Sequence, residues 1–593
     1  MCGFSAVYRY TDGDRVSAAE LDRMQARMEC RGPDGEGRWC RDDGRVALTH
    51  RRLAIIDLSG RAAQPMQSHT APHVITFNGE IYNYRELRSG LEARGCRFVT
   101  GSDTEVILHL YAEKGPDLVD DLQGMFAFAL WDGAKRGLLL ARDPFGVKPL
   151  YYADNGSCIR VASEVKALVA TGAVDTSPSA AGRAGFFLWG SVPEPFTFFR
   201  GVRALPAGNI MWIEDGKAPQ LRQYANVADL FRTPHADPGS PQAAELLRVA
   251  MNESVQRHLV SDVDVGVFLS SGIDSTTLAA IASRHGGALR TTTLAFEEYR
   301  NTASDEAPLA EAVARSCGAR HETVWVNRND FASARERLID RMDQPSVDGV
   351  NTYFVAHAAA STGLKVALSG AGADELFGGY SLFRTLPRLV NAIRRVPLAA
   401  PVGRVARQLL APLVSRVTSP KYASILELGG SWVGAYLLAR SLYLPWELPK
   451  VLGDDMAHAG LKELAPTESL HARIAGISGE RATVSVLEAS GYLRNQLLRD
   501  ADWASMSHSL ELRVPYVDWT LWKAIAPLIS SGSARIDKAA LASLAQSLPD
   551  AVRQRPKSGF QVPVRQWLQA DRDQRYSDRG LRGWARYIYD RAS

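Results

Sequence analysis

The chain of 593 residues is too long to fold around one hydrophobic core, so its length predicts two or more domains. Its 46% hydrophobic and 23% charged residues are typical of a soluble globular protein, and a net charge of +4 is too small at this length to indicate nucleic-acid binding. Six scattered cysteines without a CxxC pair argue against a structural zinc site and a disulfide framework, and favour a cytoplasmic protein.

The first predicted strand covers residues 3–10 and carries Cys2 at its start. Removal of Met1 would give Cys2 both a thiol and a free α-amine. An α-amine has an ordinary pKa of about 8, so it can act as general base for its own thiol, as in N-terminal nucleophiles. The alternative is an ordinary thiol without a catalytic role. Charged residues begin at Arg9 and no long apolar stretch follows, so we expect neither a signal peptide nor a transmembrane helix.

The next elements describe a region of about 200 residues that is rich in β-sheet. A polar helix is predicted near residues 17–29, and a turn follows at residues 31–35. Strands are predicted at residues 46–57, 73–77, 124–131 and 137–143. Asn78-Gly79 follows one of these strands, and on its own this pair is also typical of a tight hairpin turn.

Six ordered motifs in this region resemble the glutaminase domain of class II glutamine amidotransferases. They are Cys2-Gly3, Arg31-Gly32-Pro33-Asp34, His50-Arg51-Arg52-Leu53, Phe77-Asn78-Gly79-Glu80-Ile81-Tyr82-Asn83, Gly101-Ser102-Asp103-Thr104-Glu105, and residues 143–151. The resemblance implies an αββα fold of the N-terminal-nucleophile type over residues 1–215.

The resemblance also assigns roles to residues. Cys2 would attack the side-chain amide of glutamine, and Asn78 and Gly79 would stabilise the oxyanion that forms. Arg52 would bind the carboxylate of glutamine through two parallel hydrogen bonds, and the neighbouring Arg51 is the alternative candidate. The remaining predicted glutamine contacts are Ile55 and Ile56 through backbone groups, and Glu80 and Asp103 near the ammonium.

A linker is predicted over residues 216–242, because residues 232–241 are rich in Pro, Gly and Ser. An amphipathic helix at 243–260 and a buried strand at 263–269 follow. The strand runs into Ser270-Ser271-Gly272-Ile273-Asp274-Ser275 and then a helix. A small-residue loop between a strand and a helix presents backbone N–H groups to an anion. It resembles the pyrophosphate loop of ATP pyrophosphatases, with Ser271 in place of a glycine; the alternative is an ordinary strand–helix turn.

Further strands are predicted at residues 291–296, 321–326 and 365–370, with helices between them. This alternation predicts a doubly wound parallel sheet whose ligands bind at the carboxyl ends of the strands. The loops after residues 269 and 368 should then share one crevice. Asp274 and Asp374 would provide oxygen ligands for Mg²⁺ beside the phosphates, although either could instead be a helix cap.

With the motifs at residues 496–500, 505–515 and 555–560, residues 243–593 resemble the synthetase domain of glutamine-hydrolysing asparagine synthetases. This implies ATP-dependent adenylation of a carboxylate, with Mg²⁺ and release of pyrophosphate, and then amidation by ammonia that travels through an internal tunnel. Arg31 and Met125 are candidates for its lining. The residues implied for ATP and pyrophosphate are Leu269, Ser270, Ser271, Gly272, Asp274, Ser275, Ser369, Gly370 and the catalytic Lys557.

Two positions depart from the family pattern. Ala371 replaces a glutamate thought to accept protons from the attacking ammonia, and Gln344 stands where glutamate is common. Aspartate is the simplest acceptor, and a sugar uronate, a peptide acid or a natural-product acid is the alternative. A non-catalytic scaffold is a remote third interpretation. The oligomeric state stays open, with a homodimer as one alternative.

Two segments have no place in this scheme. Residues 384–416 contain seven arginines and no acidic residue, interleaved with Leu, Val and Ala. They are predicted to form either a helical insertion that covers the core or a basic face for a membrane surface or an anionic partner. Residues 571–593, rich in Arg, Asp, Trp and Tyr, are predicted to be a solvated tail or a packing extension.

Overall fold

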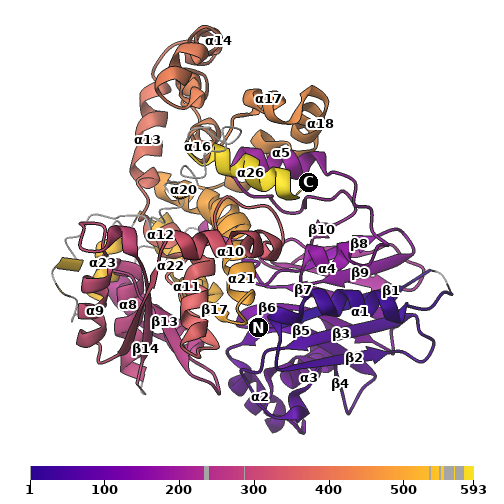
Figure 1. The fold of residues 1–593 in the computed structure, drawn as a ribbon. Coiled ribbons are helices and arrows are strands. Elements are labelled where there is room, and N and C mark those ends of the chain that lie inside the picture. Colours follow the sequence, from indigo (N-terminus) through magenta and orange to yellow (C-terminus); the bar gives the residue numbers. More distant parts are fainter. Residues whose placement is uncertain are drawn as a thin grey trace.

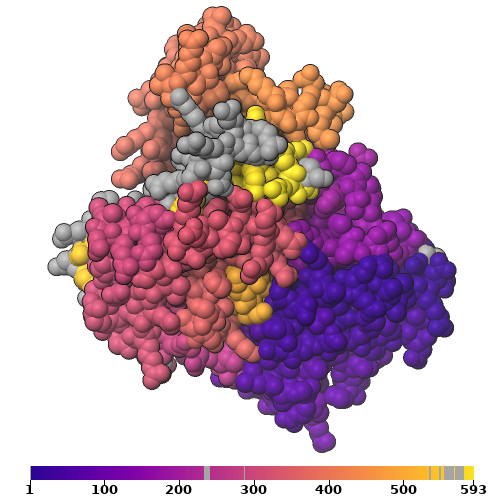
Figure 2. Space-filling view, viewed as in Figure 1, coloured from indigo at the N-terminus to yellow at the C-terminus, as the bar shows by residue number. Residues whose placement is uncertain are grey.

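A computed structural model of the protein describes residues 2–11, 13–232, 240–285, 288–532, 536–545, 549, 551–552, 567 and 580–592. Two antiparallel sheets form the N-terminal part, a parallel sheet flanked by helices forms the second part, and a helical layer lies above both (Figure 1). The two parts meet along a continuous boundary on the molecular surface (Figure 2). Lys557 lies outside the described residues.

The N-terminal part contains two six-stranded sheets. The first has the order β10-β8-β9-β1-β3-β2, with β1 (Gly3–Arg9), β2 (Gly35–Cys40), β3 (Val46–Arg52), β8 (Tyr151–Asp154), β9 (Cys158–Ala162) and β10 (Arg203–Ala204). The second has the order β12-β11-β7-β6-β5-β4, with β4 (Met66–Gln67), β5 (His73–Ile81), β6 (Gly124–Asp132), β7 (Gly137–Arg142), β11 (Asn209–Glu214) and β12 (Gln220–Gln223).

Alternation along the strands builds four layers from these sheets. In β1, Phe4 and Tyr8 pack into the core that also contains Trp131 of the second sheet, whereas Val7 packs on the opposite face against α1 (Ala18–Arg27) and α4 (Val165–Val169). The outer face of the second sheet packs through Phe77 against α2 (Tyr84–Ala93) and α3 (Asp103–Lys114). The predicted αββα arrangement is confirmed.

The second part is built on a five-stranded parallel sheet of order β15-β14-β13-β16-β17. Its strands are β13 (Val265–Phe268), β14 (Arg290–Phe296), β15 (Arg320–Val326), β16 (Val366–Leu368) and β17 (Glu511–Arg513). Val267 and Leu368 pack against α7 (Ser240–His258), α8 (Ile273–Ala282) and α9 (Ala307–Ser316), while Ala367 packs on the other face against α11 (Val350–Ser361). The predicted doubly wound sheet is confirmed.

The other helices cover and connect these sheets. They are α5 (Ala180–Trp189), α6 (Asp229–Arg232), α10 (Arg328–Arg341), α12 (Ala373–Phe377), α13 (Leu382–Ile393), α14 (Ala399–Val417), α15 (Ile425–Leu428), α16 (Trp432–Arg440), α17 (Pro449–Leu452), α18 (Asp454–Leu464), α19 (Pro466–Ile474), α20 (Glu480–Glu488), α21 (Arg499–Met506), α22 (Trp519–Ser530), α23 (Lys538–Ser543) and α26 (Arg582–Ala592). In the part of the chain that the structure describes, no helix combines the length and hydrophobicity needed to cross a bilayer.

The described end of the chain is a packing extension. Trp584 and Ile588 of α26 are buried against Phe186 and Phe187 of α5 (Figure 1). The Arg183 side chain donates to the Tyr589 hydroxyl at 2.7 Å. The C-terminal helix therefore ties the helical layer to the segment that follows the first antiparallel sheet.

Part of the predicted linker is ordered. β12 pairs with β11 and so belongs to the second antiparallel sheet, while Phe231 of α6 packs into the core that contains Trp522 of α22. The chain thus changes its packing partner between Gln223 and Phe231. The exact domain limits at residues 215 and 242 stay a prediction.

Candidate active sites

Cys2 lies at the first position before β1, buried between the two parts of the molecule. Its backbone nitrogen donates to Asn78 Oδ1 at 3.0 Å, and its Sγ lies 3.9 Å from Leu53 O. Burial raises the pKa of the Cys2 thiol, and the positive N-terminus partly opposes that shift. A thiol in this setting needs a base close by to become a nucleophile.

Asn78 and Gly79 lie next to Cys2 on β5. Asn78 is fully buried, and its Nδ2 has no hydrogen-bond acceptor among the described residues. A buried amide donor without an acceptor is costly, so it is a suitable group for an oxyanion brought by a substrate. A Cβ at Gly79 would lie 2.1 Å from Met125 O, which explains why only glycine fits at this position. The pair lies within β5 rather than in a hairpin turn.

Arg51 and Arg52 point to different surroundings, because successive side chains alternate along β3. Arg51 forms an ion pair with Glu36 at 2.9 Å. The Arg52 guanidinium instead donates to Ser59 O at 2.9 Å and to Asp57 O, on the loop that follows β3. The structure therefore gives Arg51 a surface ion pair and places Arg52 against the loop near Cys2.

The loop after β3 is held by Asp57, a residue that the sequence analysis did not select. Its φ of 50° is unusual for a residue with a side chain. Its carboxylate accepts from Ser59 Oγ at 2.6 Å and from Gly101 N at 2.7 Å, and its own N–H donates to Asp262 of the second part at 2.8 Å. The Asp-x-Ser spacing, which is typical of a side-chain-stabilised turn, was the available signal.

Ile55 and Ile56 are buried in this loop. The Ile55 carbonyl accepts from Asp262 N at 3.0 Å, and the Ile56 carbonyl lies 3.5 Å from the Arg52 guanidinium. The carbonyl groups of both residues thus already have protein partners, and their predicted contact with glutamine through backbone groups stays a prediction. Leu53 O, close to the Cys2 thiol, is the backbone acceptor that the sequence analysis missed.

Glu80 and Asp103 are both buried carboxyl groups. Asp103, in the first turn of α3, accepts from Ile81 N at 3.0 Å, and burial raises its pKa to about 6. Glu80 is buried on β5, and burial and the charge of Glu511 raise its pKa well above its ordinary value. Arg513 Nη2 lies 3.7 Å from Glu80 Oε2.

The surroundings of Cys2 continue directly into the second part. Arg31 is fully buried; its Nε donates to Cys2 O at 3.1 Å, and its Nη1 and Nη2 bind Asp502 of α21 at 2.8 and 3.1 Å. Met125, the other predicted tunnel residue, is buried in the core that contains Leu269 and Val267. Arg31 therefore links Cys2 to α21, and Met125 shares an apolar core with residues of the parallel sheet.

The predicted phosphate loop follows β13. Ser270 N donates to Ser275 Oγ at 3.0 Å, Gly272 N donates to Ser270 Oγ at 3.1 Å, and Gly272 is the N-cap of α8. Leu269 is buried beneath the loop. Ser271, which stands in place of the family glycine, is also buried, so its side chain turns away from solvent.

The loop after β16 lies beside it, because β13 and β16 pair in parallel. Ser369 N donates to Arg513 O at 2.8 Å, and a Cβ at Gly370 would lie 3.2 Å from the Cβ of Asp274. Asp274 and Asp374 are joined by Lys538: its Nζ lies 2.8 Å from Asp374 Oδ1 and also forms an ion pair with Asp274. The two predicted carboxylates thus meet around one cation.

Lys538 was missed by the sequence analysis. It begins α23, whose N-cap is Asp537. Positive charge is unfavourable in the first turn of a helix, so a lysine directly after an N-cap aspartate was the available signal. Burial alone would lower the pKa of Lys538, but Asp274 and Asp374 outweigh burial and raise it.

The donor set fits Mg²⁺ only in part. Among the described residues no group of three or more His, Cys, Asp and Glu is arranged to hold a metal ion. Asp274 and Asp374 offer the hard oxygen atoms that Mg²⁺ prefers, and phosphate oxygens and water would have to complete its coordination. Lys538 lies where such an ion would bind.

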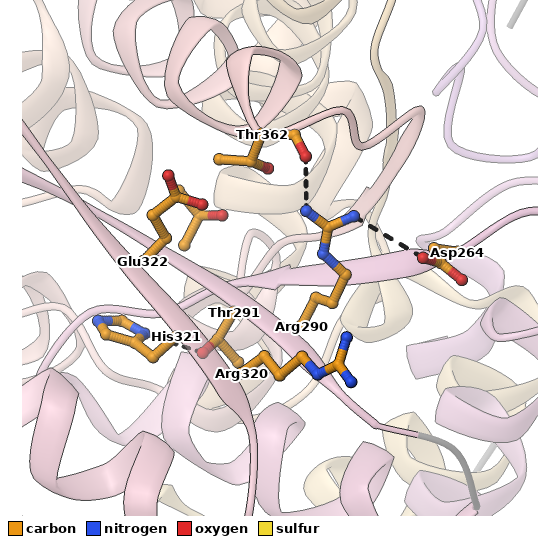
Figure 3. Close-up of a pocket in the computed structure, with 8 residues that line it drawn as sticks. Asp264, Arg290, Thr291, Arg320, His321, Glu322 and Thr362 are labelled. Carbon is orange, nitrogen blue, oxygen red and sulfur yellow. Dashed lines mark hydrogen bonds and ion pairs between the residues drawn. The ribbon is translucent and has the colours of Figure 1, made fainter.

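A hollow of about 400 Å³ lies at the other end of the parallel sheet (Figure 3). It is lined by residues at the amino ends of β14 and β15. Arg290 there donates to Thr362 O at 2.6 Å and lies 3.7 Å from Asp264. Ligands of such sheets bind at the carboxyl ends, so this hollow is separate from the predicted nucleotide site.

The two departures from the family pattern have different surroundings. Ala371 is half-buried beside Ser369, and its N–H lies 3.3 Å from Ser369 Oγ. Gln344 is buried and accepts from Phe198 N at 3.1 Å. Glu375 lies one turn after Ala371, and burial and the charge of Asp374 raise its pKa to about 8, so its carboxyl group is mostly protonated at neutral pH.

Comparison with known proteins divides the chain in the same way. Residues 1–225 match the family model of the glutamine amidotransferase domain, and residues 246–588 match that of asparagine synthase. A putative glutamine-hydrolysing asparagine synthetase of Mycobacterium tuberculosis is 36% identical over 93% of this chain and 85% of its own length. Asparagine synthetase 1 of Bacillus subtilis is 31% identical over 96% and 88%, and asparagine synthetase B of Escherichia coli is 34% identical over 63% of each chain.

Proposed function

The chain belongs to the glutamine-hydrolysing asparagine synthetase family. We propose that it amidates a carboxylate by way of an acyl-adenylate, with aspartate as the simplest acceptor. The position of Arg31 supports this proposal. Its buried side chain contacts both the backbone of Cys2 and Asp502 of the second part, so ammonia released at Cys2 would enter an interior that both parts build.

At the first site, Cys2 would attack the side-chain amide carbon of glutamine. After removal of Met1, the nitrogen that donates to Asn78 Oδ1 becomes the α-amine, so it lies close enough to take the thiol proton. Asn78 Nδ2 and Gly79 N–H would stabilise the oxyanion. Arg52, Glu80 and Asp103 would hold the charged groups of glutamine. Water would then release glutamate, after ammonia has left.

At the second site, the carboxylate of the acceptor would attack the α-phosphorus of ATP and release pyrophosphate. The loop at residues 269–275, together with Ser369 and Gly370, would bind the nucleotide, and Lys557 would add positive charge. Mg²⁺, held by Asp274 and Asp374, would supply charge neutralisation at the phosphates. Ammonia that reaches the acyl-adenylate past Arg31 and Met125 gives the amide, AMP and a proton. This chemistry, with its free thiols, suits the cytoplasm.

Ala371 supports a second candidate: the same reaction on another carboxylic acid. A methyl group cannot accept the proton that the attacking ammonia loses. If aspartate is the acceptor and the missing carboxylate limits turnover, Ala371→Glu should raise the rate of amidation; no change, or a loss, would indicate a different proton route or a different acceptor.

The experiment that tests the proposal measures products from glutamine, Mg-ATP and a panel of carboxylic acids. AMP and pyrophosphate formed only with a particular acid would identify the acceptor. ADP and phosphate would refute adenylation. Amide formation from free ammonia in the Cys2→Ala variant separates failure of the second site from failure of nitrogen supply.

A further inference from the structure

The arginine-rich segment divides into two helices with opposite packing. In α13, Leu386 and Val390 are buried in the helical layer, as expected for an insertion that covers the core. α14 does not behave in this way. Only Gly403 of its residues is buried, where the helix crosses the backbone of Glu427. α14 lies at the outer end of the helical layer and forms part of a protrusion (Figures 1 and 2).

The apolar side chains of α14 face solvent in one stripe. They recur every three or four residues from Leu398, the N-cap of α14, to Leu413, along roughly 22 Å, which places them on one face. Their exposed fractions are 72% for Leu398, 55% for Val402, 57% for Val405, 70% for Leu409 and 56% for Leu413. The prediction that this part of the segment covers the core is therefore wrong for α14, because its apolar face points outward.

The charged residues of the segment are all arginines, and their positions differ from those of the apolar stripe. Arg407 turns towards the body of the protein and forms an ion pair with Glu427 at 2.6 Å, whereas Arg404, 3.4 Å from Glu427, keeps 71% of its side chain exposed. Arg394 and Arg395, a few residues before the helix, and Arg416, its second-to-last residue, are exposed. No acidic residue occurs anywhere in residues 384–416. The exposed apolar stripe thus has only positive charge at its ends.

We propose that α14 docks on the anionic surface of a lipid bilayer. A helix with an apolar face and basic flanks lies in the interface with its apolar side chains in the acyl boundary and its arginines at the headgroups. A second copy of the chain is a poor occupant, because two such faces would bring only positive charges together. α14 lies at the outer end of the helical layer, away from the three sheets, so docking would leave the two proposed sites open (Figure 1).

The test is co-sedimentation of the full-length protein with vesicles. We expect binding to vesicles of phosphatidylcholine and phosphatidylglycerol in equal parts, and at least about tenfold less binding to phosphatidylcholine alone. The double variant V405E/L409E should lower binding by roughly tenfold or more. Leu221→Glu, at a similarly exposed apolar residue on β12, is the matched control and should bind like the wild type.

Glutaminase activity and ATP–pyrophosphate exchange without vesicles should be unchanged in both variants, which shows that they fold. Absence of binding to the anionic vesicles, equal binding to both kinds of vesicle, or undiminished binding of V405E/L409E would overturn the proposal. A dimer in sedimentation velocity that V405E/L409E dissociates, without any vesicle binding, would assign the stripe to a second copy instead.

Discussion

The two proposed sites differ in how they hold charge before a substrate arrives. Around Cys2 the donor for an oxyanion is already in place, since Asn78 Oδ1 is occupied and its buried Nδ2 has no acceptor among the described residues. At the proposed nucleotide site the two carboxylates share one cation, Lys538, which offsets half of their charge. Activity at the first site should therefore fall when a single group such as Cys2 or Asn78 is removed. The second site should instead respond when Mg²⁺ replaces Lys538 between the two carboxylates.

The largest expected effect is on nitrogen supply. Cys2→Ala should lower glutamine-dependent glutamate release by about 10⁴-fold or more, because no other group can form the acyl-enzyme. Amidation with free ammonia should continue. Cys40→Ala, at an exposed cysteine, is the control. Glutamate release that survives in Cys2→Ala would contradict the proposal that Cys2 is the nucleophile.

Removal of the oxyanion donor should have the next largest effect. Asn78→Ala should lower glutaminase kcat by about 10²–10³-fold, since one such donor contributes roughly 3–4 kcal/mol to the transition state. Asn83→Ala removes hydrogen bonds to Asp121 O and Gln123 N beyond the end of β5 and should change stability more than kcat. Equal kcat values in the two variants would show that Asn78 only shapes the strand.

The cation at the nucleotide site is tested by Lys538→Met. Two carboxylates left facing one another should lower the free energy of unfolding by about 2 kcal/mol, less than for a fully buried pair because 19% of the lysine side chain is exposed. Mg²⁺ should restore more stability to the variant than it adds to the wild type. Thermal unfolding measures both, and Lys523→Met, at an exposed lysine, is the control. If Mg²⁺ stabilised the variant and the wild type equally, Lys538 would not occupy the proposed Mg²⁺ site.

The smallest effect concerns pH. The pKa of Asp103 is raised to about 6, so its carboxyl group is neutral below that pH and charged above it. Only the charged form attracts the ammonium of glutamine, so affinity should rise by about tenfold as the pH increases through 6. Calorimetry with Cys2→Ala measures binding without turnover. The rise should vanish in Asp103→Asn; a rise that persists would place the titrating group elsewhere.

The sequence predicted much of the fold, because its signals are local. β1, β5, β6, β7 and β13 all lie within a few residues of their predicted limits, since each strand is an apolar run bounded by turn residues. The motifs also selected Asn78, which contacts Cys2, and Asp274 and Asp374, which lie close together. β12 was assigned to the linker, because its four residues are all exposed and carry no apolar pattern.

What could not be predicted depends on contacts across long stretches of chain. Lys538 lies 264 residues from Asp274. Asp57 and Asp262 meet only when the two parts pack together. The outward turn of the α14 stripe is also invisible to periodicity, which reports that a helix has an apolar face but not whether anything covers it.

β17 joins the parallel sheet to the surroundings of Cys2. This three-residue strand accepts a hydrogen bond from Ser369 through the Arg513 carbonyl, while the Arg513 side chain lies 3.7 Å from Glu80 beside Cys2. Excised from the chain, or grafted onto a different synthetase, the N-terminal part would keep its motifs but lose both Arg513 and Glu511 from the surroundings of Glu80. Arg31 would lose Asp502 and keep Glu164, at 3.4 Å. A buried cation that loses one of its partners is destabilised, so the N-terminal part is not an independent module.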